Sequence, residues 1–564
     1  MTGDNNGRWA GSYEWPDDHE SYLLNAHHTI LALRSHPSLL LWCAGNELSP
    51  KYKNPNPTIS IGLNQLLATL DPGRFYIESS MSPQSPDVTL YDSSYALAPQ
   101  DGPYGILYED DWYNIRNSGL QNYSNTPISY QPEVGSVFTP VLRSLKLFLP
   151  SESLQPGSIP GYLATSDDVD PMWQYHKYIS YVTDDYDHIY AYQSNYKQIL
   201  TERKEVNRAK DSKLNGCMSA EDFAWTAQLV QYQQYRALVE GFMLHQWKFY
   251  SAVILWKSQS PWPALRGALY DYYLDTNGAF WGVRAATRSA SLHAQLHPGT
   301  LGVSLINRSP KAVTDVRVTV HYTDLHGTRL HTTRLQAPRV AGNSVWNAPT
   351  RLQWPITKTN KSVLLFFLSI DETSTTSEDE KEEEIDENKN MSFSLSNFYW
   401  LTDPSLGLRK DYSELGWLRK QHTVHVTIEV MNVEYFSCTA LLREGSPIAL
   451  PRAACEPLED ASATCGGARE DEVLYAEFRV TTPRDASAVA FMVRHTLLRM
   501  PVTGSTYDDR VLPTFYSANY YVLPSGARVM IAIAARFSRH DTDGIYLETE
   551  GWNVPQSRIK LTSS

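Results

Sequence analysis

Two carboxylates in the first quarter of this chain are placed to do chemistry together. Glu47 closes the segment 42–47 (WCAGNE), and Glu133 lies in the segment 131–135 (QPEVG). In glycoside hydrolysis, one carboxyl group stays protonated to donate to the leaving oxygen, while the other is ionised and attacks the anomeric carbon or activates water. Their surroundings must hold the two pKa values apart. The alternative interpretation is that both are ordinary strand-end acids in ion pairs.

The spacing of these two acids suits a barrel of alternating strands and helices. They are 86 residues apart, and at roughly 30 residues per strand–helix unit this is about three strands. Catalytic residues of such barrels lie at the carboxyl ends of strands. Gly45 and Gly135, each two residues from its glutamate, would let a substrate approach the backbone closely.

Helix and strand signals alternate from the start of the chain to about residue 285. Asp17 and Glu20 resemble a capping box, and apolar residues then recur at helical spacing to about residue 35. A long helix is predicted from Ser219, capped by Ser219 and Asp222, to about Tyr250. The apolar run 39–44 predicts a strand buried on both faces, as in a parallel sheet.

Further candidate strands lie at 75–77, 127–130 and 252–256. Five candidate barrel strands end near Glu47, Ser79, Leu107, Glu133 and Trp256. Because five strands cannot close an eight-stranded barrel, the predicted fold class is α/β plus β, with an incomplete (β/α)8 TIM barrel over residues 1–285.

After about residue 289 the apolar pattern changes to a period of two, which is typical of half-buried antiparallel strands. It recurs at 316–322, 424–430 and 474–480. We predict an immunoglobulin-like β-sandwich over 286–370 and a C-terminal β-sandwich domain over 392–564. The stretch 371–391 between them is predicted to be a disordered acidic linker, because residues 371–390 hold ten acids and two lysines.

Composition excludes several classes of protein. The chain has 564 residues, 42% of them hydrophobic, and a net charge of −13, of which the acidic stretch supplies −8. No basic patch with interleaved aromatic residues points to nucleic acid, and no run of about 18 apolar residues points to a membrane span. No spacing of metal ligands and no phosphate-binding loop occurs, so we expect no cofactor and no metal.

The segment 36–47 (HPSLLLWCAGNE) resembles the acid/base signature of glycoside hydrolase family 2, and 131–136 (QPEVGS) resembles its nucleophile segment. Within this family the chain is most similar to the β-mannosidase branch, in particular to plant-type endo-β-mannosidases. Further matching segments lie at 101–104, 173–178, 234–241, 254–262, 265–267, 511–520 and 551–553. The resemblance covers most of the chain and is weakest from about residue 372 to 470.

The resemblance implies a retaining double displacement on an oligosaccharide or glycopeptide, with the Manβ1-4GlcNAc linkage of N-glycans as the expected target. Glu133 would be the nucleophile and Glu47 the acid and base. Asn46 would hydrogen-bond the sugar 2-hydroxyl, and Trp256 and Trp262 would form the floor and wall of the sugar site. For both tryptophans the alternative is plain core packing.

Family members place two sandwich domains and the first barrel strands before the segment that matches residues 2–4, so we expect this chain to be truncated at its N-terminus. Two other functions stay open. One is an exo-β-glucosaminidase, which shares the family architecture; the other is an inactive remnant or a carbohydrate-binding protein. The sequence leaves the oligomeric state and the compartment open, although the resemblance allows a vacuolar or secreted protein.

Overall fold

The computed structural model describes residues 18–43, 57–77, 109–114, 130–135, 139–160, 170–176, 192, 218–248, 250–265, 268–289, 291–355, 363–371, 397–404, 411–437, 472–499, 508–537 and 544–561. The chain forms two compact units that interleave along the sequence. The first contains residues 1–104, 114–135 and 245–256; the second contains 105–113, 136–244 and 257–564. Within the described ranges, no helix is long and apolar enough to cross a bilayer.

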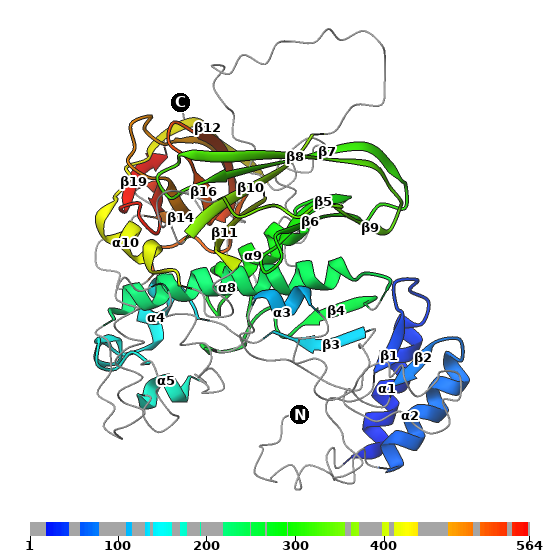
Figure 1. The fold of residues 1–564 in the computed structure, drawn as a ribbon. Helices are drawn as coiled ribbons and strands as arrows, with labels where there is room; N and C mark the ends of the chain where they lie inside the picture. Colours follow the sequence, from blue (N-terminus) through cyan, green and yellow to red (C-terminus); the bar gives the residue numbers. More distant parts are fainter. Residues whose placement is uncertain are drawn as a thin grey trace, which may run out of the picture. The chain divides into compact units, whose positions relative to one another are not determined.

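The first unit consists of short parallel strand pairs and two helices (Figure 1). Its elements are α1 (His19–Leu33), β1 (Leu41–Cys43), α2 (Pro57–Leu70), β2 (Phe75–Ile77), β3 (Tyr130–Val134) and β4 (Ala252–Leu255). Strand β1 pairs in parallel with β2, and β3 with β4. These are four of the five expected barrel strands. The fifth, near Leu107, lies outside the described residues, and two parallel pairs do not by themselves establish a closed barrel.

Two details of the first unit differ from the sequence predictions. The N-cap of α1 is Asp18, whose carboxylate accepts a hydrogen bond from the Ser21 amide at 2.9 Å. Strand β1 is not buried on both faces: Leu41 and Trp42 are half-buried and Cys43 is exposed. Within the described ranges β1 pairs only with β2, so it belongs to a two-stranded sheet and not to the interior of a larger parallel sheet.

The second unit is organised around a long helix, α8 (Ala220–Leu244). The Asp222 amide donates to Ser219 Oγ at 3.0 Å, which confirms the predicted cap, but the helix ends six residues before the predicted Tyr250. A second helix, α9 (Gly278–Thr287), crosses α8 closely. A Cβ at Gly278 would lie 2.0 Å from the Gln228 carbonyl oxygen and one at Gly282 2.3 Å from that of Tyr232, so only glycine permits this approach.

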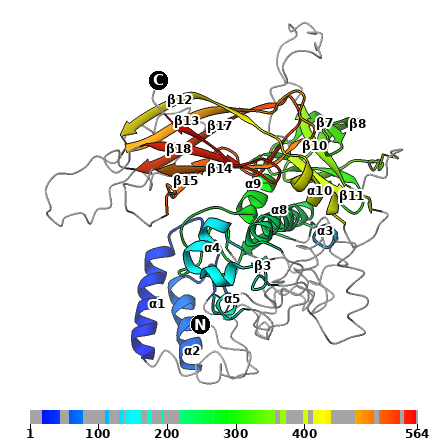
Figure 2. The same ribbon diagram turned by 90° about the vertical axis from the view of Figure 1, so that its left-hand side faces the viewer.

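Shorter helices complete the helical part of this unit. They are α3 (Glu109–Tyr113), α4 (Leu142–Phe148), the 3-10 helix η4 (Ser151–Leu154), α5 (Pro171–Tyr175) and α10 (Ser413–Gln421). Both views show the strands of this unit on one side of α8 (Figures 1 and 2). Every residue of α8 from Phe223 to Phe242 is buried, so the helix is covered on all of its faces.

The strands of the second unit form two sandwiches. The first pairs the sheet β11-β10-β7-β8 with β5-β6-β9, and Val318, Phe366, Leu296 and Leu305 from both sheets share one core. Its strands are β5 (Leu292–His297), β6 (Gly302–Asn307), β7 (Val313–Thr323), β8 (Arg329–Val340), β9 (Ser344–Asn347), β10 (Val363–Asp371) and β11 (Asn397–Thr402). The predicted alternation at 316–322 is confirmed, because its four apolar residues are buried.

The second sandwich pairs the sheet β12-β13-β17-β15 with β16-β14-β18-β19, as Figure 2 shows. Its strands are β12 (Thr427–Ser437), β13 (Glu472–Thr481), β14 (Ala490–Arg499), β15 (Thr514–Tyr516), β16 (Tyr521–Leu523), β17 (Arg528–Phe537), β18 (Ile545–Glu550) and β19 (Ser557–Leu561). Phe478, Ile531, Leu497 and Leu547 meet in its core, which extends onto α8. The acidic stretch 372–391 lies outside the described residues, and the predicted domain boundaries stay predictions.

Candidate functional site

Glu133 lies in β3, next to an interruption in its pairing with β4. Gln131 pairs with Val253 and Val134 with Leu255, so the register shifts across Pro132 and Glu133. Proline has no amide hydrogen to donate to a ladder, which explains the irregularity. Such interruptions redirect side chains and are frequent beside active sites. Gly135, with φ of +121°, then turns the chain away in a conformation that suits glycine.

The same strand pair brings Trp256 next to the end of β3. The Trp256 amide donates to the Val134 carbonyl oxygen at 2.8 Å, and Val134 is fully buried. Trp256 itself is half-buried, so part of its ring is open to solvent. Because β3 and β4 are parallel, their carboxyl ends coincide, and two of the residues predicted for the sugar site leave the sheet at the same edge.

Glu47 and Asn46 follow β1 by a few residues and lie outside the described part of the chain. The segment that leads to them is firmly held. Trp42 Nε1 donates to Asp71 at 2.9 Å, and this hydrogen bond, with help from Arg74, lowers the pKa of the Asp71 carboxyl group. Arg74 also donates to the carbonyl oxygens of Leu39 and His36 at 2.8 and 2.9 Å. The strand before Glu47 is therefore anchored through its middle residue, Trp42, and through the segment that precedes it.

Trp262 belongs to the second unit, where it forms an aromatic group with His176 and Tyr175. The rings of Trp262 and His176 stack at 5.6 Å, and Tyr175 meets Trp262 edge-on at 5.9 Å. His176 is buried and donates Nδ1–H to the Pro263 carbonyl oxygen at 2.6 Å, as a histidine with a structural role does. Tyr175 is 65% exposed. No sequence motif distinguishes Tyr175, although it stands beside His176 in a segment that matches the family.

A buried carboxylate that sequence reasoning missed lies on α8. Glu240 accepts hydrogen bonds from Tyr113 (2.5 Å), Tyr399 (2.8 Å) and His293 Nε2 (3.0 Å). Burial opposes its ionisation, but the hydrogen bonds and the His293 and Arg236 charges hold the pKa of Glu240 below its ordinary value. Glu240 has no exposed surface, and its carboxylate accepts hydrogen bonds from side chains of the first sandwich, so it links α8 to that sandwich.

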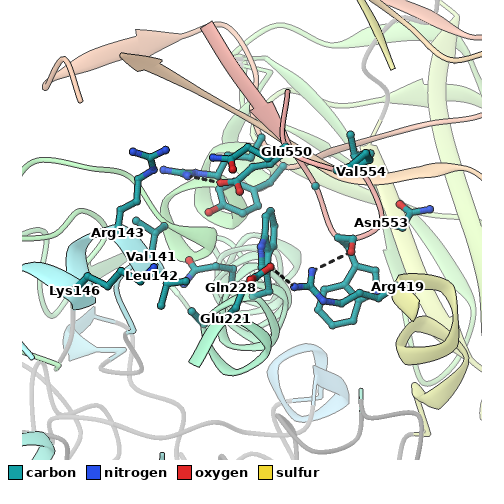
Figure 3. A pocket seen from close by; sticks show the side chains of 18 of the residues that line it. Val141, Leu142, Arg143, Lys146, Glu221, Gln228, Arg419, Glu550, Asn553 and Val554 are labelled. Carbon is teal, nitrogen blue, oxygen red and sulfur yellow. Dashed lines mark hydrogen bonds and ion pairs between the residues drawn. The ribbon is translucent and has the colours of Figure 1, made fainter. Parts of the chain in front are cut away.

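The second unit also contains a cavity of about 760 Å³ between α4, α8 and the C-terminal sandwich, which we call the balanced cavity. Figure 3 shows Arg143 and Lys146 on one side and Arg419 and Asn553 on the other. Each of its four lining arginines has a carboxylate partner. The pairs are Arg143 with Asp509 and Glu548, Arg419 with Glu221 and Asp222, Arg494 with Glu550 and Asp275, and Arg558 with Glu548.

Among the residues described, no group of three or more His, Cys, Asp or Glu side chains is arranged to hold a metal ion.

No family model matches the chain. Comparison with individual proteins does find relatives. It is 28% identical to mannosylglycoprotein endo-beta-mannosidase of Lilium longiflorum, over all of this chain and 57% of the relative. It is 21% identical to exo-beta-D-glucosaminidase of Hypocrea jecorina, over 97% of this chain and 52% of the relative.

Solved structures share the fold. Exo-chitosanase CsxA of Amycolatopsis orientalis superimposes with a TM-score of 0.64 at 17% identity, covering 98% of this chain and 56% of that one. Beta-D-mannosidase from Dictyoglomus thermophilum superimposes with a TM-score of 0.53 at 14% identity, covering 96% and 52%. The chain thus spans about half the length of the relatives it matches, and these comparisons confirm its resemblance to the β-mannosidase branch of glycoside hydrolase family 2.

Proposed function

We propose that this chain carries the catalytic acids of a retaining glycoside hydrolase that cleaves β-mannosidic linkages, with Manβ1-4GlcNAc of N-glycans as the target. The observation that carries the proposal is the end of β3, where the register shift at Glu133 and the hydrogen bond from Trp256 to Val134 coincide. The similarity of the whole of this chain to 57% of a mannosylglycoprotein endo-beta-mannosidase supports the choice of substrate.

We also propose that strands β1 to β4 belong to a (β/α)8 barrel. Helix α2 would be the connection between the parallel strands β1 and β2. Each predicted catalytic glutamate then follows or ends a barrel strand on the face where barrel enzymes place their active sites.

In the proposed mechanism, a Glu133 carboxylate oxygen attacks the anomeric carbon while the bond to the leaving oxygen breaks and Glu47 gives that oxygen its proton. Glu47 then takes a proton from water, whose oxygen displaces Glu133 and releases the sugar. This double displacement requires the two carboxyl groups to lie about 5–5.5 Å apart. Asn46 would hydrogen-bond the 2-hydroxyl, a contact that can strengthen in the transition state. Trp256 and Trp262 would pack on the apolar face of the sugar.

The decisive experiment replaces Glu133 with Gln in the full-length protein and measures hydrolysis of an aryl β-mannoside. We expect hydrolysis to be abolished, because an amide cannot form the glycosyl ester. Added azide should restore turnover of an activated substrate by Glu133→Ala and give the α-azide, since azide would attack from the face that the nucleophile normally occupies.

Glu429→Gln is a matched control, since Glu429 is an exposed acid in a surface ion pair with Arg479. Undiminished hydrolysis by Glu133→Gln would rule out the nucleophile assignment. In the same assay, Glu47→Ala should lose about 10²–10⁴-fold on poor leaving groups and less on activated ones. Equal loss on both would argue against the acid role.

An exo-β-glucosaminidase is the second candidate, favoured by the higher TM-score with exo-chitosanase CsxA than with the β-mannosidase. Relative turnover of aryl β-mannosides and β-glucosaminides separates the two. Binding of mannosides without turnover of either substrate would instead support a carbohydrate-binding protein.

A further inference from the structure

The balanced cavity is large enough to hold a ligand. Its volume of about 760 Å³ falls within the range of about 300–1,000 Å³ that small-molecule sites occupy. The described residues that line it all belong to the second unit, and none of the residues predicted for the catalytic site is among them. Binding in this cavity would therefore not depend on the proposed glycosidase activity.

The walls of the cavity carry little excess charge, because each of its four arginines is paired with carboxylates. Arg419, for example, donates to Asp222 and Glu221 at 2.9 Å each and to the Trp552 carbonyl oxygen at 3.0 Å. Such pairs do little to attract an ion, and they hold the side chains in place before a ligand arrives. A ligand without net charge suits these walls.

Two polar side chains of the lining retain hydrogen-bonding capacity. Lys146, on α4, is exposed and has no acidic partner among the described residues. Glu550 binds Arg494 through Oε1 at 3.0 Å, and no described residue donates to its Oε2. Burial raises the pKa of Glu550, although the Arg494 charge opposes this, so its carboxylate gains from a further donor. Figure 3 shows Lys146 and Glu550 on different elements at the edge of the cavity.

A third polar group, the hydroxyl of Tyr520, is buried in the lining of the same cavity. Tyr520 is 1% exposed, and its hydroxyl makes no hydrogen bond to any described residue. Buried polar groups are nearly always hydrogen-bonded, so an unsatisfied hydroxyl beside a cavity would gain from a partner that enters it. A small movement of the wall would bring this hydroxyl into contact with a ligand.

A sugar combines the properties that this lining favours. It has no net charge, and each of its hydroxyl groups both donates and accepts hydrogen bonds, so it can use Lys146 and Glu550 together. The apolar faces of a sugar ring need apolar side chains to pack on, and Leu142, Leu147 and Pro555 supply them in the lining. Small-molecule sites typically combine such apolar walls with a few placed polar groups.

We propose that the balanced cavity binds a neutral sugar, with the Lys146 ammonium group donating to one hydroxyl oxygen and Glu550 Oε2 accepting from another hydroxyl. The Tyr520 hydroxyl is a further partner once the wall has adjusted. The second unit thereby gains a carbohydrate-binding site of its own, which does not rest on the roles proposed for Glu47 and Glu133.

Isothermal titration calorimetry on the full chain tests the proposal. The probes are maltose, cellobiose and α-1,6-mannobiose, which contain no β-mannosidic bond, and gluconate is the anionic comparison. We expect at least one neutral probe to bind, with an affinity that hardly changes with salt, and gluconate to bind more weakly than that probe. Lys146→Ala should weaken binding about tenfold, since a hydrogen bond from a charged donor is lost, and Lys146→Arg should weaken it less.

Lys311→Ala is the matched control, because Lys311 is an exposed lysine that is not among the described residues lining the cavity. Circular dichroism of each variant shows whether the fold is retained. No binding of any neutral probe would overturn the proposal. Unchanged affinity in Lys146→Ala would also overturn it, since the sugar would then be bound elsewhere, for instance at the predicted catalytic residues. Tighter binding of gluconate than of every neutral probe, lost at high salt, would overturn the choice of an uncharged ligand.

Discussion

The balanced cavity and helix α9 place arginines in opposite surroundings. In the balanced cavity Arg494 is 5% exposed and bonded to Asp275 at 2.8 Å and to Glu550 at 3.0 Å. On α9, Arg284 is exposed and donates to the Ser517 carbonyl oxygen at 3.2 Å. A buried cation needs an acidic partner because its desolvation costs several kcal/mol, whereas an exposed cation stays hydrated. The stability of the fold should therefore depend on the buried arginine and its acids far more than on the exposed one.

Among the variants that test this comparison, Asp275→Asn should lower the free energy of unfolding the most. Asp275 lies between Arg494 and Arg510, at 2.8 and 2.7 Å, and their charges keep its pKa low in spite of burial. Removing its charge leaves two buried arginines short of a partner, which should lower the free energy of unfolding by about 3–5 kcal/mol. Urea denaturation measures the loss. Asp509→Asn, at a partly exposed pair with Arg143, should cost far less, and equal losses would contradict the distinction.

The second-largest effect should be a dependence of the free energy of unfolding on pH, caused by His495, the residue that follows Arg494. Burial, together with the Arg494 charge, lowers the pKa of His495 to about 3. The unfolded chain binds a proton at this histidine below its ordinary pKa of about 6.5, whereas the folded chain does not. This contribution to stability is therefore present above pH 6.5 and is lost as the pH falls toward 3, at about 1.4 kcal/mol per pH unit.

Denaturation of the native protein and of His495→Gln over this pH range checks the expectation. The variant should show a shallower loss, because it lacks the titrating group, whereas His331→Gln, at an exposed histidine, should follow the native curve. Parallel curves for the native protein and His495→Gln would show that His495 is not held neutral by its surroundings.

The smallest effect should follow Arg284→Gln on α9. Because this side chain is exposed and hydrogen-bonded only to the Ser517 carbonyl oxygen among the described residues, the free energy of unfolding should change by no more than about 0.5 kcal/mol. Arg494→Gln, the equivalent change in the balanced cavity, should cost several kcal/mol, since it removes the arginine partner of Glu550 and leaves Asp275 with Arg510 alone. Similar losses for the two variants would show that the buried and the exposed arginine do not differ as described.

Local patterns predicted those parts of the fold in which the signal lies within one element. The strand 75–77 and the cap of α8 at Ser219 were predicted correctly, as was the alternation in β7, because apolar period and capping are local properties. The end of α8 was predicted six residues too late. The burial of β1 was also wrong, because burial depends on which neighbours cover a strand.

The residues of the candidate site also fall into two groups, those that sequence motifs predicted and those that only the structure revealed. Glu133 and Trp256 were singled out from motifs, and the structure shows their strands paired in parallel with a shared edge. Glu240, Tyr175 and Arg284 were not singled out. Their importance comes from partners such as His293, Trp262 and Ser517, which lie 53 to 233 residues away and which no local pattern connects.

The sequence by itself determined the residue types available for catalysis, the family resemblance and the change from α/β to β structure near residue 289, since motif and periodicity are written along the chain. Only the tertiary structure decided which charges are neutralised. An arginine has the same letter whether it is buried with Asp275 at 2.8 Å, as Arg494 is, or exposed to solvent, as Arg284 is, and burial sets whether its charge must be neutralised within the core.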